Sequence, residues 1–335
     1  MTKVAINGLG RIGRMVFRLI ADSEHLELAA VNASYPAETL AHLINYDSTH
    51  GRWEKTVEAK GSALYVNGKE IKIVSDRDPA NLPWKELEVD IVFEATGKFN
   101  HGDKAQGHLD AGAKKVLLTG PSKGGNVQTI VIGANESELD VSGYNVFSNA
   151  SCTTNCLAPV AKVLNDSFGI ESGLMTTVHA YTNDQNTLDN PHKDLRRART
   201  ASDSIIPTST GAAKALGVVL PELNDKLDGL ALRVPTPNVS LVDLVVDLNK
   251  TVTAEEVNET FEKHAEGNLK GVLGVTYEPL VSKDFNTDSR SVVIDGSLTM
   301  VMRDNKVKVL AWYDNEWGYS VRTVELAKAI AEGMK

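Results

Sequence analysis

Short apolar runs alternate with amphipathic stretches along the first half of the chain. Apolar residues that recur every three to four positions predict helices near residues 11–23 and 36–45. Compact apolar runs predict strands at 3–6, 26–32, 89–97, 114–121, 129–135 and 144–151, with a less regular stretch in the middle. Strands that alternate with helices are joined by right-handed crossovers and form a parallel sheet. The first half therefore predicts a doubly wound α/β domain of the nucleotide-binding type.

The pattern changes near residue 151. A helical stretch then reaches about Phe168 and contains Pro159, where a kink is expected. Beyond it, apolar and polar residues alternate over long segments at 173–182, 229–248 and 291–315. This hairpin-like alternation predicts a second domain with a mainly antiparallel sheet. The last stretch, 320–335, has the period of one amphipathic helix.

Composition and charge exclude several classes of protein. Hydrophobic residues make up 42% and charged residues 24% of the chain, which is typical of a globular protein. The net charge of -9 argues against an extended nucleic-acid or anionic membrane surface. Without a long apolar run or a signal-like N-terminus, we expect neither a membrane span nor a secretory leader. The two cysteines fit a reducing compartment, so we expect a cytoplasmic protein.

A glycine motif, Gly8-x-Gly10-x-x-Gly13, lies between the first predicted strand and the first predicted helix. In that context the first glycine permits a tight turn, the second lets a phosphate approach the backbone, and the third allows close helix packing. The alternative is a plain strand-to-helix turn. An acidic residue for the adenosine ribose is expected about 20 residues later, but Ala33 and Ser34 stand there.

The segment SNASCTTNC, at 148–156, offers a candidate nucleophile. A thiol just inside a helix N-terminus lies near unsatisfied N–H groups, so we expect Cys152 to have a lowered pKa. The alternative is an inert buried cysteine. Cys156 follows one turn later and is better explained by packing, because two cysteines alone are too few ligands for a structural zinc site; we expect no metal.

A nucleophilic cysteine requires a base, and His179 in TTVHAYTND is the best placed of the eight histidines. The basic cluster HKDLRRAR, at 192–199, is harder to interpret. Arginines with nearby hydroxyl residues can hold phosphate, but they can equally form a solvated or intersubunit face of salt bridges.

Taken together, these segments resemble the phosphorylating glyceraldehyde-3-phosphate dehydrogenases over essentially the whole chain. The motifs that carry the resemblance stand in the family's order: INGLGRIGR, SNASCTTNCLAP, TTVHAYTNDQ, PHKDLRRAR, IIPTSTGAAKA, RVPTPNVS and WYDNEWGYS. The resemblance implies a dinucleotide-binding domain at 1–151, a catalytic domain at 152–316, and a C-terminal helix at 317–335 that returns to the first domain. It also implies a homotetramer in which a loop at about 181–203 reaches a neighbouring subunit's cofactor.

The resemblance implies a mechanism and two anion sites. Cys152 would attack the aldehyde, His179 would take the proton, and hydride transfer to the nicotinamide would leave a thioester that inorganic phosphate cleaves. The substrate's own phosphate would contact Thr182 and Arg233. The attacking phosphate would contact Ser151, Thr153, Arg197, Thr210 and Gly211.

For the cofactor, the resemblance assigns the pyrophosphate loop to Gly8, Gly10, Arg11, Ile12 and Gly13. Arg77 and Thr119 would contact the adenosine and nicotinamide halves, and Asn315 would anchor the carboxamide. The family's NAD-using members carry an Asp where this chain has Ala33, and a Leu-Pro pair where it has Asn190 and Pro191. Neither Glu27 nor Glu38 is placed to replace that Asp.

The missing carboxylate predicts a preference for NADP, with NAD still possible. A carboxylate would repel a 2′-phosphate, and Ser34 adds a small hydrogen-bond donor. Arg77, or Asn190 of a neighbouring subunit, is the expected compensating group, because no Arg or Lys lies between residues 19 and 51.

Two other functions remain open at this stage. The same scaffold could oxidise erythrose 4-phosphate, a reaction that ends in hydrolysis rather than phosphate transfer. A non-catalytic binding or adhesion protein could keep the scaffold alone.

Overall fold

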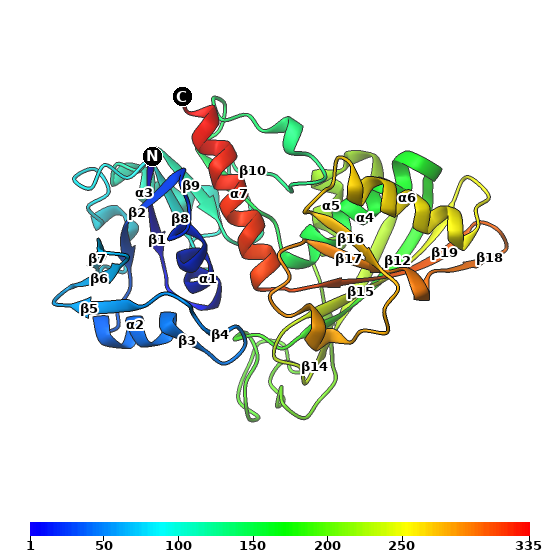
Figure 1. Cartoon of the computed structure of the whole chain (residues 1–335), viewed down its shortest axis with the longest axis horizontal. Coiled ribbons are helices and arrows are strands. Elements are labelled where there is room, and N and C mark those ends of the chain that lie inside the picture. The colour runs from blue at the N-terminus through cyan, green and yellow to red at the C-terminus, as the bar shows by residue number, and fades with distance from the viewer. The chain divides into compact units, whose positions relative to one another are not determined.

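The computed structural model describes all residues from 1 to 335 (Figure 1). By its contacts the chain divides into two compact units. Unit 1 comprises residues 1–130, 137–150 and 320–335, and unit 2 comprises residues 131–136 and 151–319. Unit 1 is therefore built from three separate pieces of chain, the last of which is the end of the C-terminal helix.

A nine-stranded sheet forms unit 1, in the order β10-β11-β9-β8-β1-β2-β7-β6-β5. Its strands are β1 (Thr2–Asn7), β2 (Leu26–Asn32), β5 (Val57–Lys60), β6 (Ala63–Val66), β7 (Lys69–Val74), β8 (Ile91–Glu94), β9 (Lys115–Leu118), β10 (Gln128–Thr129) and β11 (Val146–Ser148). Its helices are α1 (Arg11–Ile20), α2 (Ala37–Asn45) and α3 (Gly102–Asp110), and β3 (Tyr46–Asp47) pairs with β4 (Gly51–Arg52) as a separate hairpin.

The sheet of unit 1 winds in both directions from β1. This strand pairs in parallel with β2 on one side and with β8 on the other, so the chain reverses its direction of winding there. Ligands of such sheets bind outside the carboxyl ends of the strands at this switch point. Gly8 follows the last residue of β1 directly, which places the glycine motif at the switch point.

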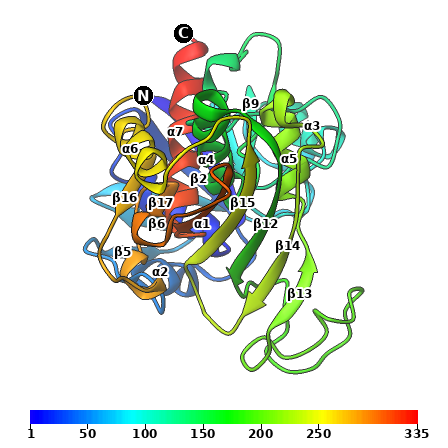
Figure 2. The same ribbon diagram turned by 90° about the vertical axis from the view of Figure 1, so that its right-hand side faces the viewer.

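Unit 2 contains an eight-stranded sheet in the order β13-β14-β12-β15-β19-β17-β16, with β18 paired to β19. Its strands are β12 (Ile170–Ala180), β13 (Ile206–Ser209), β14 (Leu227–Val234), β15 (Ser240–Leu248), β16 (Leu273–Thr276), β17 (Val292–Asp295), β18 (Met300–Met302) and β19 (Lys306–Tyr313). Figure 2 shows β12 between β14 and β15. Only the β12–β14 and β16–β17 pairs are parallel, which confirms the mainly antiparallel second sheet.

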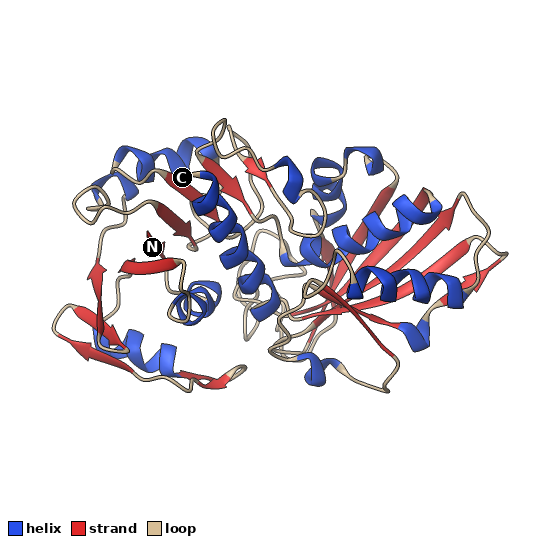
Figure 3. Cartoon of the chain, turned by 45° about the horizontal axis from the view of Figure 1, so that its top comes forward, coloured by secondary structure: helices blue, strands red, loops and turns tan.

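Helices pack along the sheet of unit 2, as the colouring of Figure 3 makes visible. They are α4 (Cys152–Phe168), α5 (Ala212–Val219) and α6 (Ala254–Glu266), and α7 (Trp317–Gly333) starts in this unit. Residues of β12 alternate between the two faces of the sheet: Met175, Thr177 and His179 are buried, whereas Leu174 is 68% exposed. This alternation puts His179 on the side that α4 covers.

Several predicted elements differ from the observed ones. The first helix ends at Ile20 rather than near 23, because the Ser23 hydroxyl accepts the N–H groups of His25 and Leu26 and closes a turn. The strand expected at 129–135 is confined to Gln128–Thr129, because the Asn135 side chain accepts the N–H of Val131 and bends the chain.

Other differences concern pairing. The segment 229–248 forms two strands as expected, but β14 and β15 lie on opposite sides of β12 instead of pairing as a hairpin. The less regular stretch before residue 89 contains the antiparallel strands β5, β6 and β7. Pro159 lies inside α4, which runs unbroken from Cys152 to Phe168. No helix of the chain is both long enough and apolar enough to cross a membrane.

Candidate active site

The nucleophile candidate opens the longest helix of unit 2. Ala150 has a φ of 52°, a left-handed conformation that turns the chain sharply before α4. Ser151 caps the helix, since its Oγ accepts the N–H of Thr154 at 3.0 Å. Cys152 is therefore the first helical residue, where the backbone N–H groups lack partners within the helix.

Strand β12 brings a histidine to this thiol. The Cys152 Sγ lies 3.5 Å from the His179 Nε2, within the range of a hydrogen bond to sulfur. Direct pairing of β12 with β14 sets His179 beside Arg233 in register. The three residues predicted as nucleophile, base and substrate-phosphate ligand thus converge in unit 2.

The His179 Nδ1 has two neighbours that favour different protonation patterns. It lies 2.7 Å from the Ala180 carbonyl oxygen, which can only accept a proton, and 2.8 Å from the Arg233 Nη1, which can only donate one. A proton on Nδ1 leaves Nε2 as a base toward the thiol. A proton on Nε2 makes it a donor toward a thiolate. The site therefore suits proton exchange between sulfur and imidazole.

Burial controls the ionisation of both groups. Burial, with the nearby Arg233 charge as a second cause, lowers the pKa of His179 to about 3, so the imidazole is neutral at pH 7. Burial also raises the pKa of the Cys152 thiol, although the Arg233 charge and hydrogen bonds at Thr153 oppose it. The expectation that the helix N-terminus gives Cys152 a lowered pKa is therefore wrong, because loss of water outweighs it. A thiolate at this site requires a base.

Tyr313, which the sequence did not single out, ties the two catalytic elements together. Its hydroxyl lies 2.9 Å from the Thr153 Oγ1 and 2.8 Å from the Thr177 Oγ1, and its ring packs edge-on against His179. Burial raises the pKa of this phenol well above its usual value, so it stays neutral. Thr153, predicted as a phosphate ligand, is buried and already bonded here.

The remaining predicted phosphate ligands are only partly assembled. Arg197 forms ion pairs with Asp184 and Asp194, and its Nε donates to the Thr208 Oγ1 at 2.9 Å. The Thr210 Oγ1 accepts the N–H of Ala212, and Gly211 is the N-cap of α5, with open space where a Cβ would lie. Thr182 is half-buried, and no hydrogen bond joins its side chain to Cys152 or His179.

Asn315, the predicted carboxamide anchor, is buried in unit 2. Its Oδ1 accepts the Ser240 hydroxyl at 2.7 Å. The adjacent Asp314 accepts four N–H groups, from Asn238, Thr287, Glu316 and Trp317, and so fixes the start of α7. Ser240 was not foreseen; the only signal was its place in the RVPTPNVS motif.

The glycine motif of unit 1 has the close contacts that a dinucleotide turn requires. Gly8 has a φ of 95°, and a Cβ there would lie 2.8 Å from the Thr96 side chain. A Cβ on Gly13 would lie 2.0 Å from the Gly8 carbonyl oxygen, whereas Gly10 faces open space. Gly10 is the N-cap of α1 and offers no side-chain cap, and the first turn of the helix has no acid. These features fit an anionic group at the helix N-terminus.

A buried network holds this turn, and sequence reasoning missed it. Asn7 donates to the Glu94 Oε2 at 2.5 Å and accepts from the Asn32 amide at 2.7 Å. His108 lies 3.0 Å from Glu94 and accepts the Trp84 indole N–H at 3.0 Å. The only sequence signal was an acid inside the apolar run VDIVFEATG. Arg11 extends from the same turn and pairs with Asp47.

Ala33 and Ser34, which stand where an acid was expected, lie in an accessible segment after β2. Asn32 donates to the Asp76 carbonyl at 2.8 Å and accepts the Asp76 N–H at 3.0 Å, which holds the loop after β7 beside the end of β2. Ala33 is half-buried, and Ser34 and Arg77 are exposed. Arg77 forms no ion pair. The structure thus gathers Ala33, Ser34 and Arg77 at one rim, while Thr119 lies at the end of β9 and donates to the Glu94 carbonyl.

Asn190 lies in the long connection between β12 and β13, within unit 2. Its N–H donates to the Ala198 carbonyl at 2.9 Å, and its own carbonyl accepts the Asn186 amide at 3.0 Å. The residue is exposed. These bonds shape the connection but leave the side chain of Asn190 outside them.

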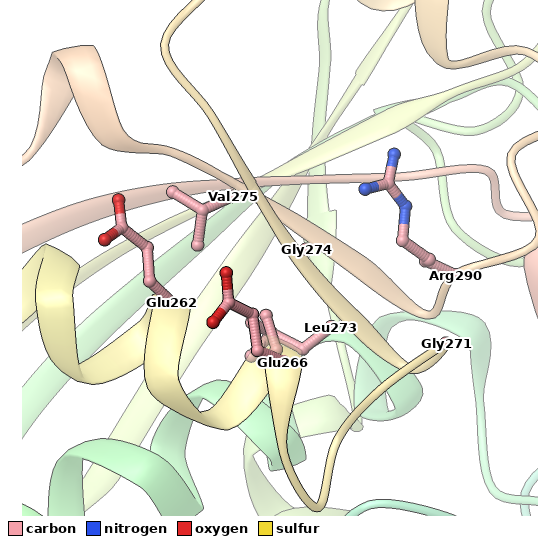
Figure 4. A pocket seen from close by; sticks show the side chains of 8 residues that line it. Glu262, Glu266, Gly271, Leu273, Gly274, Val275 and Arg290 are labelled. Carbon is pink, nitrogen blue, oxygen red and sulfur yellow. The ribbon is translucent and has the colours of Figure 1, made fainter.

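A pocket of about 310 Å³ in unit 2 lies away from this chemistry. Figure 4 shows Glu262 and Glu266 on consecutive turns of α6, with Arg290 across from them. Arg290 lies over Gly274 and pairs with Asp288 at 2.6 Å. Because neither Cys152 nor His179 lines this pocket, it is not the catalytic one.

Comparison with known proteins agrees with the geometry. Residues 151–315 match the family model for the glyceraldehyde 3-phosphate dehydrogenase C-terminal domain, and residues 2–102 match the NAD-binding domain of the same family. The chain is 65% identical over 331 residues to glyceraldehyde-3-phosphate dehydrogenase 2 of Staphylococcus epidermidis, covering 99% of this chain and 96% of that protein. It is also 65% identical over 329 residues to glyceraldehyde-3-phosphate dehydrogenase 2 of Staphylococcus aureus, covering 98% and 96%.

Proposed function

The chain belongs to the glyceraldehyde-3-phosphate dehydrogenase family, and we propose from this that it oxidises glyceraldehyde 3-phosphate to 1,3-bisphosphoglycerate with uptake of inorganic phosphate. The reaction is reversible, so the same site can reduce the acyl phosphate. The observation that carries the proposal is the 3.5 Å approach of the Cys152 Sγ to the His179 Nε2, with Arg233 beside the imidazole.

In the first step, the Cys152 sulfur forms a bond to the aldehyde carbon. The thiol proton passes to the His179 Nε2 and from there to the new alkoxide, which gives a thiohemiacetal. Because the imidazole of His179 is neutral at pH 7, its Nε2 has a lone pair to accept this proton when Nδ1 carries the ring proton and donates it to the Ala180 carbonyl. Arg233, whose Nη1 is fixed on the Ala180 carbonyl at 3.0 Å, is proposed to hold the substrate's phosphate together with Thr182.

In the second step, His179 takes the hydroxyl proton of the thiohemiacetal as the thioester forms. The nicotinamide, when bound, supplies the hydride acceptor for this oxidation. A phosphate oxygen then attacks the thioester carbon, the carbon–sulfur bond breaks, and the Cys152 thiolate leaves. Ser151, Thr153, Arg197, Thr210 and Gly211 are proposed to hold that phosphate. Because Arg197 pairs with Asp184 and Asp194, bound phosphate has to compete with these carboxylates.

We infer that the dinucleotide is held by Gly8, Gly10, Arg11, Ile12 and Gly13, with Thr119 and Asn315 toward the nicotinamide and Asn190 of a neighbouring subunit toward the adenosine. The contacts of Gly8 and Gly13 support this, because neither position has room for a side chain. The N-cap of α1 supports it as well, since no side chain caps this helix N-terminus, where an anion is favoured.

We also infer that NADP is preferred over NAD. A carboxylate at position 33 would form a hydrogen bond to the ribose of NAD and strengthen its binding by about 1.5–3 kcal/mol. It would also repel a 2′-phosphate about 4 Å away and weaken the binding of NADP by roughly 4 kcal/mol at an effective dielectric of 20. Its absence therefore shifts selectivity toward NADP. The exposed Ser34 and Arg77 at the same rim support the proposal, since both can donate to the added phosphate.

We propose that the chain forms a homotetramer and that the exposed face of the eight-stranded sheet is one of its subunit interfaces. Leu174 on β12 and Leu230 on β14 are 68% and 45% exposed, and Met300 and Met302 are exposed on β18. Asp243 pairs with Lys308 on the same sheet at 2.8 Å. An exposed apolar face with charged neighbours is typical of subunit interfaces. Sedimentation should give a mass four times 36.2 kDa, and Leu174→Asp should lower it.

Initial rates test the proposed reaction. Glyceraldehyde 3-phosphate is supplied with NADP or NAD, each with and without inorganic phosphate. We expect steady turnover only with phosphate, a single turnover per subunit without it, and a higher kcat/KM with NADP. Erythrose-4-phosphate oxidation with hydrolysis is the alternative reaction, and turnover independent of phosphate would support it instead. A higher kcat/KM with NAD would overturn the cofactor preference alone.

A further inference from the structure

The side chains of Asn238 and Ser240, on either side of Val239, form hydrogen bonds to Asp314 and Asn315. Val239 has a φ of 68°, a conformation that β-branched residues rarely adopt, and it is buried. The preceding Asn238 donates to the Asp314 carboxylate at 2.8 Å, and the following Ser240 donates to the Asn315 Oδ1 at 2.7 Å. The two residues that flank Val239 thus hold two consecutive residues of another segment.

The hydrogen bonds of Ser240 decide which way the Asn315 amide points. The Ser240 Oγ accepts the N–H of Ala180 at 3.1 Å, and Ala180 directly follows His179. A hydroxyl has one proton, and the acceptor within reach of this one is the Asn315 Oδ1. If the amide were flipped, the buried hydroxyl proton would face an N–H₂ group and have no acceptor, which is unfavourable.

The bond from Ser240 leaves the Nδ2 end of the Asn315 amide free. Ser240 and Asn315 are both buried, and the Asn315 Nδ2 has no hydrogen-bond partner in the protein. With Oδ1 occupied, Asn315 presents donors only.

We propose that Ser240 is a positioning residue that locks Asn315 with its Nδ2 toward the ligand, so that this site selects a pyridine ring bearing a carbonyl oxygen. The proposal rests on the proposed function, in which Asn315 anchors the nicotinamide carboxamide. It adds the polarity of that contact: Asn315 donates and the carboxamide oxygen accepts. The Ser240 hydroxyl touches only protein atoms and acts through Asn315.

Equilibrium binding to the protein without cofactor tests the proposal. Calorimetric titrations use the nicotinamide dinucleotide, its 3-acetylpyridine analogue, which keeps the carbonyl but lacks the amide N–H₂, and ADP-ribose, which lacks the ring. All three ligands share the same 2′ group. We expect Ser240→Ala to weaken the first two equally, about fivefold, and ADP-ribose less than 1.5-fold.

A double-mutant cycle separates positioning from a general structural effect. If Ser240 acts through Asn315, Ser240→Ala should change the Kd of the nicotinamide dinucleotide less than 1.5-fold in an Asn315→Ala background. Ser291→Ala is the matched control, because Ser291 is also buried and its hydroxyl has no partner. It should leave all three Kd values unchanged. Ser240→Cys keeps the volume and loses most of the hydrogen bonding, so it should reproduce the loss if the alanine variant unfolds.

The outcomes separate the positioning role of Ser240 from dinucleotide binding itself. Equal loss for both ring-bearing ligands supports the proposal. Loss for the nicotinamide ligand alone would mean that Oδ1 faces the ligand, and loss for all three ligands or for none would remove Ser240 from the site; either result overturns the proposal while dinucleotide binding stands. A wild-type chain that binds none of the three overturns the proposed function, and this inference with it.

Discussion

The proposed catalytic pair in unit 2, Cys152 and His179, and the proposed cofactor rim in unit 1, Ala33, Ser34 and Arg77, differ in how their side chains are held. Around Cys152 and His179, strand register and hydrogen bonds to protein hold neighbouring side chains, including Tyr313 and, through the N–H of Ala180, Ser240. At the rim, Ser34 and Arg77 are exposed side chains without protein partners, and only the backbone beneath them is held, through Asn32.

This difference implies that the chemical step and the choice of cofactor depend on separate sets of residues. A buried, interlocked site tolerates few substitutions, because each removed atom leaves a cavity or an unpaired polar group. An exposed rim on a fixed backbone can exchange side chains at small energetic cost. We therefore expect changes around Cys152 to abolish or slow the reaction, and changes around Ala33 to redirect it.

The largest effect is expected from Cys152→Ala. Without the sulfur no thioester can form, so kcat should fall at least about 10⁴-fold. Measurement of kcat with glyceraldehyde 3-phosphate checks this, with Cys156→Ala as control, because Cys156 lies on the same helix but is fully buried and is not placed as a nucleophile. A Cys152→Ala variant with appreciable turnover would contradict the mechanism.

The next largest effect is expected from His179→Asn. The amide cannot take the thiol proton, and the raised pKa of Cys152 leaves little thiolate without a base, so kcat should fall about 10²–10⁴-fold. Alkylation of Cys152 by iodoacetamide provides a second measurement that needs no cofactor. Its rate at pH 7 should fall as well, and an unchanged rate would argue against His179 as the base.

At the rim, Ala33→Asp should reverse cofactor selectivity without loss of the chemistry. The introduced carboxylate repels a 2′-phosphate and binds the ribose of NAD, and solvent at the exposed rim screens the repulsion, so the ratio of kcat/KM for NADP to that for NAD should fall about 10²–10³-fold. The kcat with saturating NAD should change less than about threefold. If kcat itself collapses, the separation of the two regions is wrong.

Burial of His179 also predicts a pH dependence of stability. The folded pKa is about 3 against an ordinary 6.5, so between these pH values the unfolded chain binds a proton that the folded chain does not. This group's contribution is therefore complete above about pH 6.5 and decreases as the pH falls toward 3. Relative to its own value at pH 7.5, wild type at pH 4.5 should lose about 3 kcal/mol more of its unfolding free energy than His179→Asn does. The unfolding free energies come from urea titrations. If those of wild type and His179→Asn change equally with pH, the buried neutral state of His179 is contradicted.

The smallest effect is expected from Arg77→Ala. An exposed charge contributes modestly, so the Kd for NADP should rise about three- to tenfold and the Kd for NAD should stay within twofold. Calorimetry at two salt concentrations gives the comparison, because a charge contact with the 2′-phosphate weakens as salt rises. Equal changes for both cofactors would remove Arg77 from the specificity rim.

The sequence predicted the two kinds of sheet, because periodicity and glycine spacing are local signals. It did not predict that β14 and β15 flank β12, since pairing depends on long-range register. The same limit hid Tyr313 and Ser240, which act through neighbours distant in sequence. It also gave the Cys152 pKa the wrong direction, because the helix N-terminus is visible in the sequence and the degree of burial is not.

The threading of the chain has a consequence for synthesis. Unit 1 is completed by residues 320–335, and the Asn149 amide donates to the Thr323 hydroxyl at 2.9 Å. Roughly 170 residues separate these partners, so at about 5–20 residues per second the nascent unit waits roughly 10 to 35 seconds for its last helix. The nucleotide-binding half is therefore the first to be translated and cannot be the first to be finished.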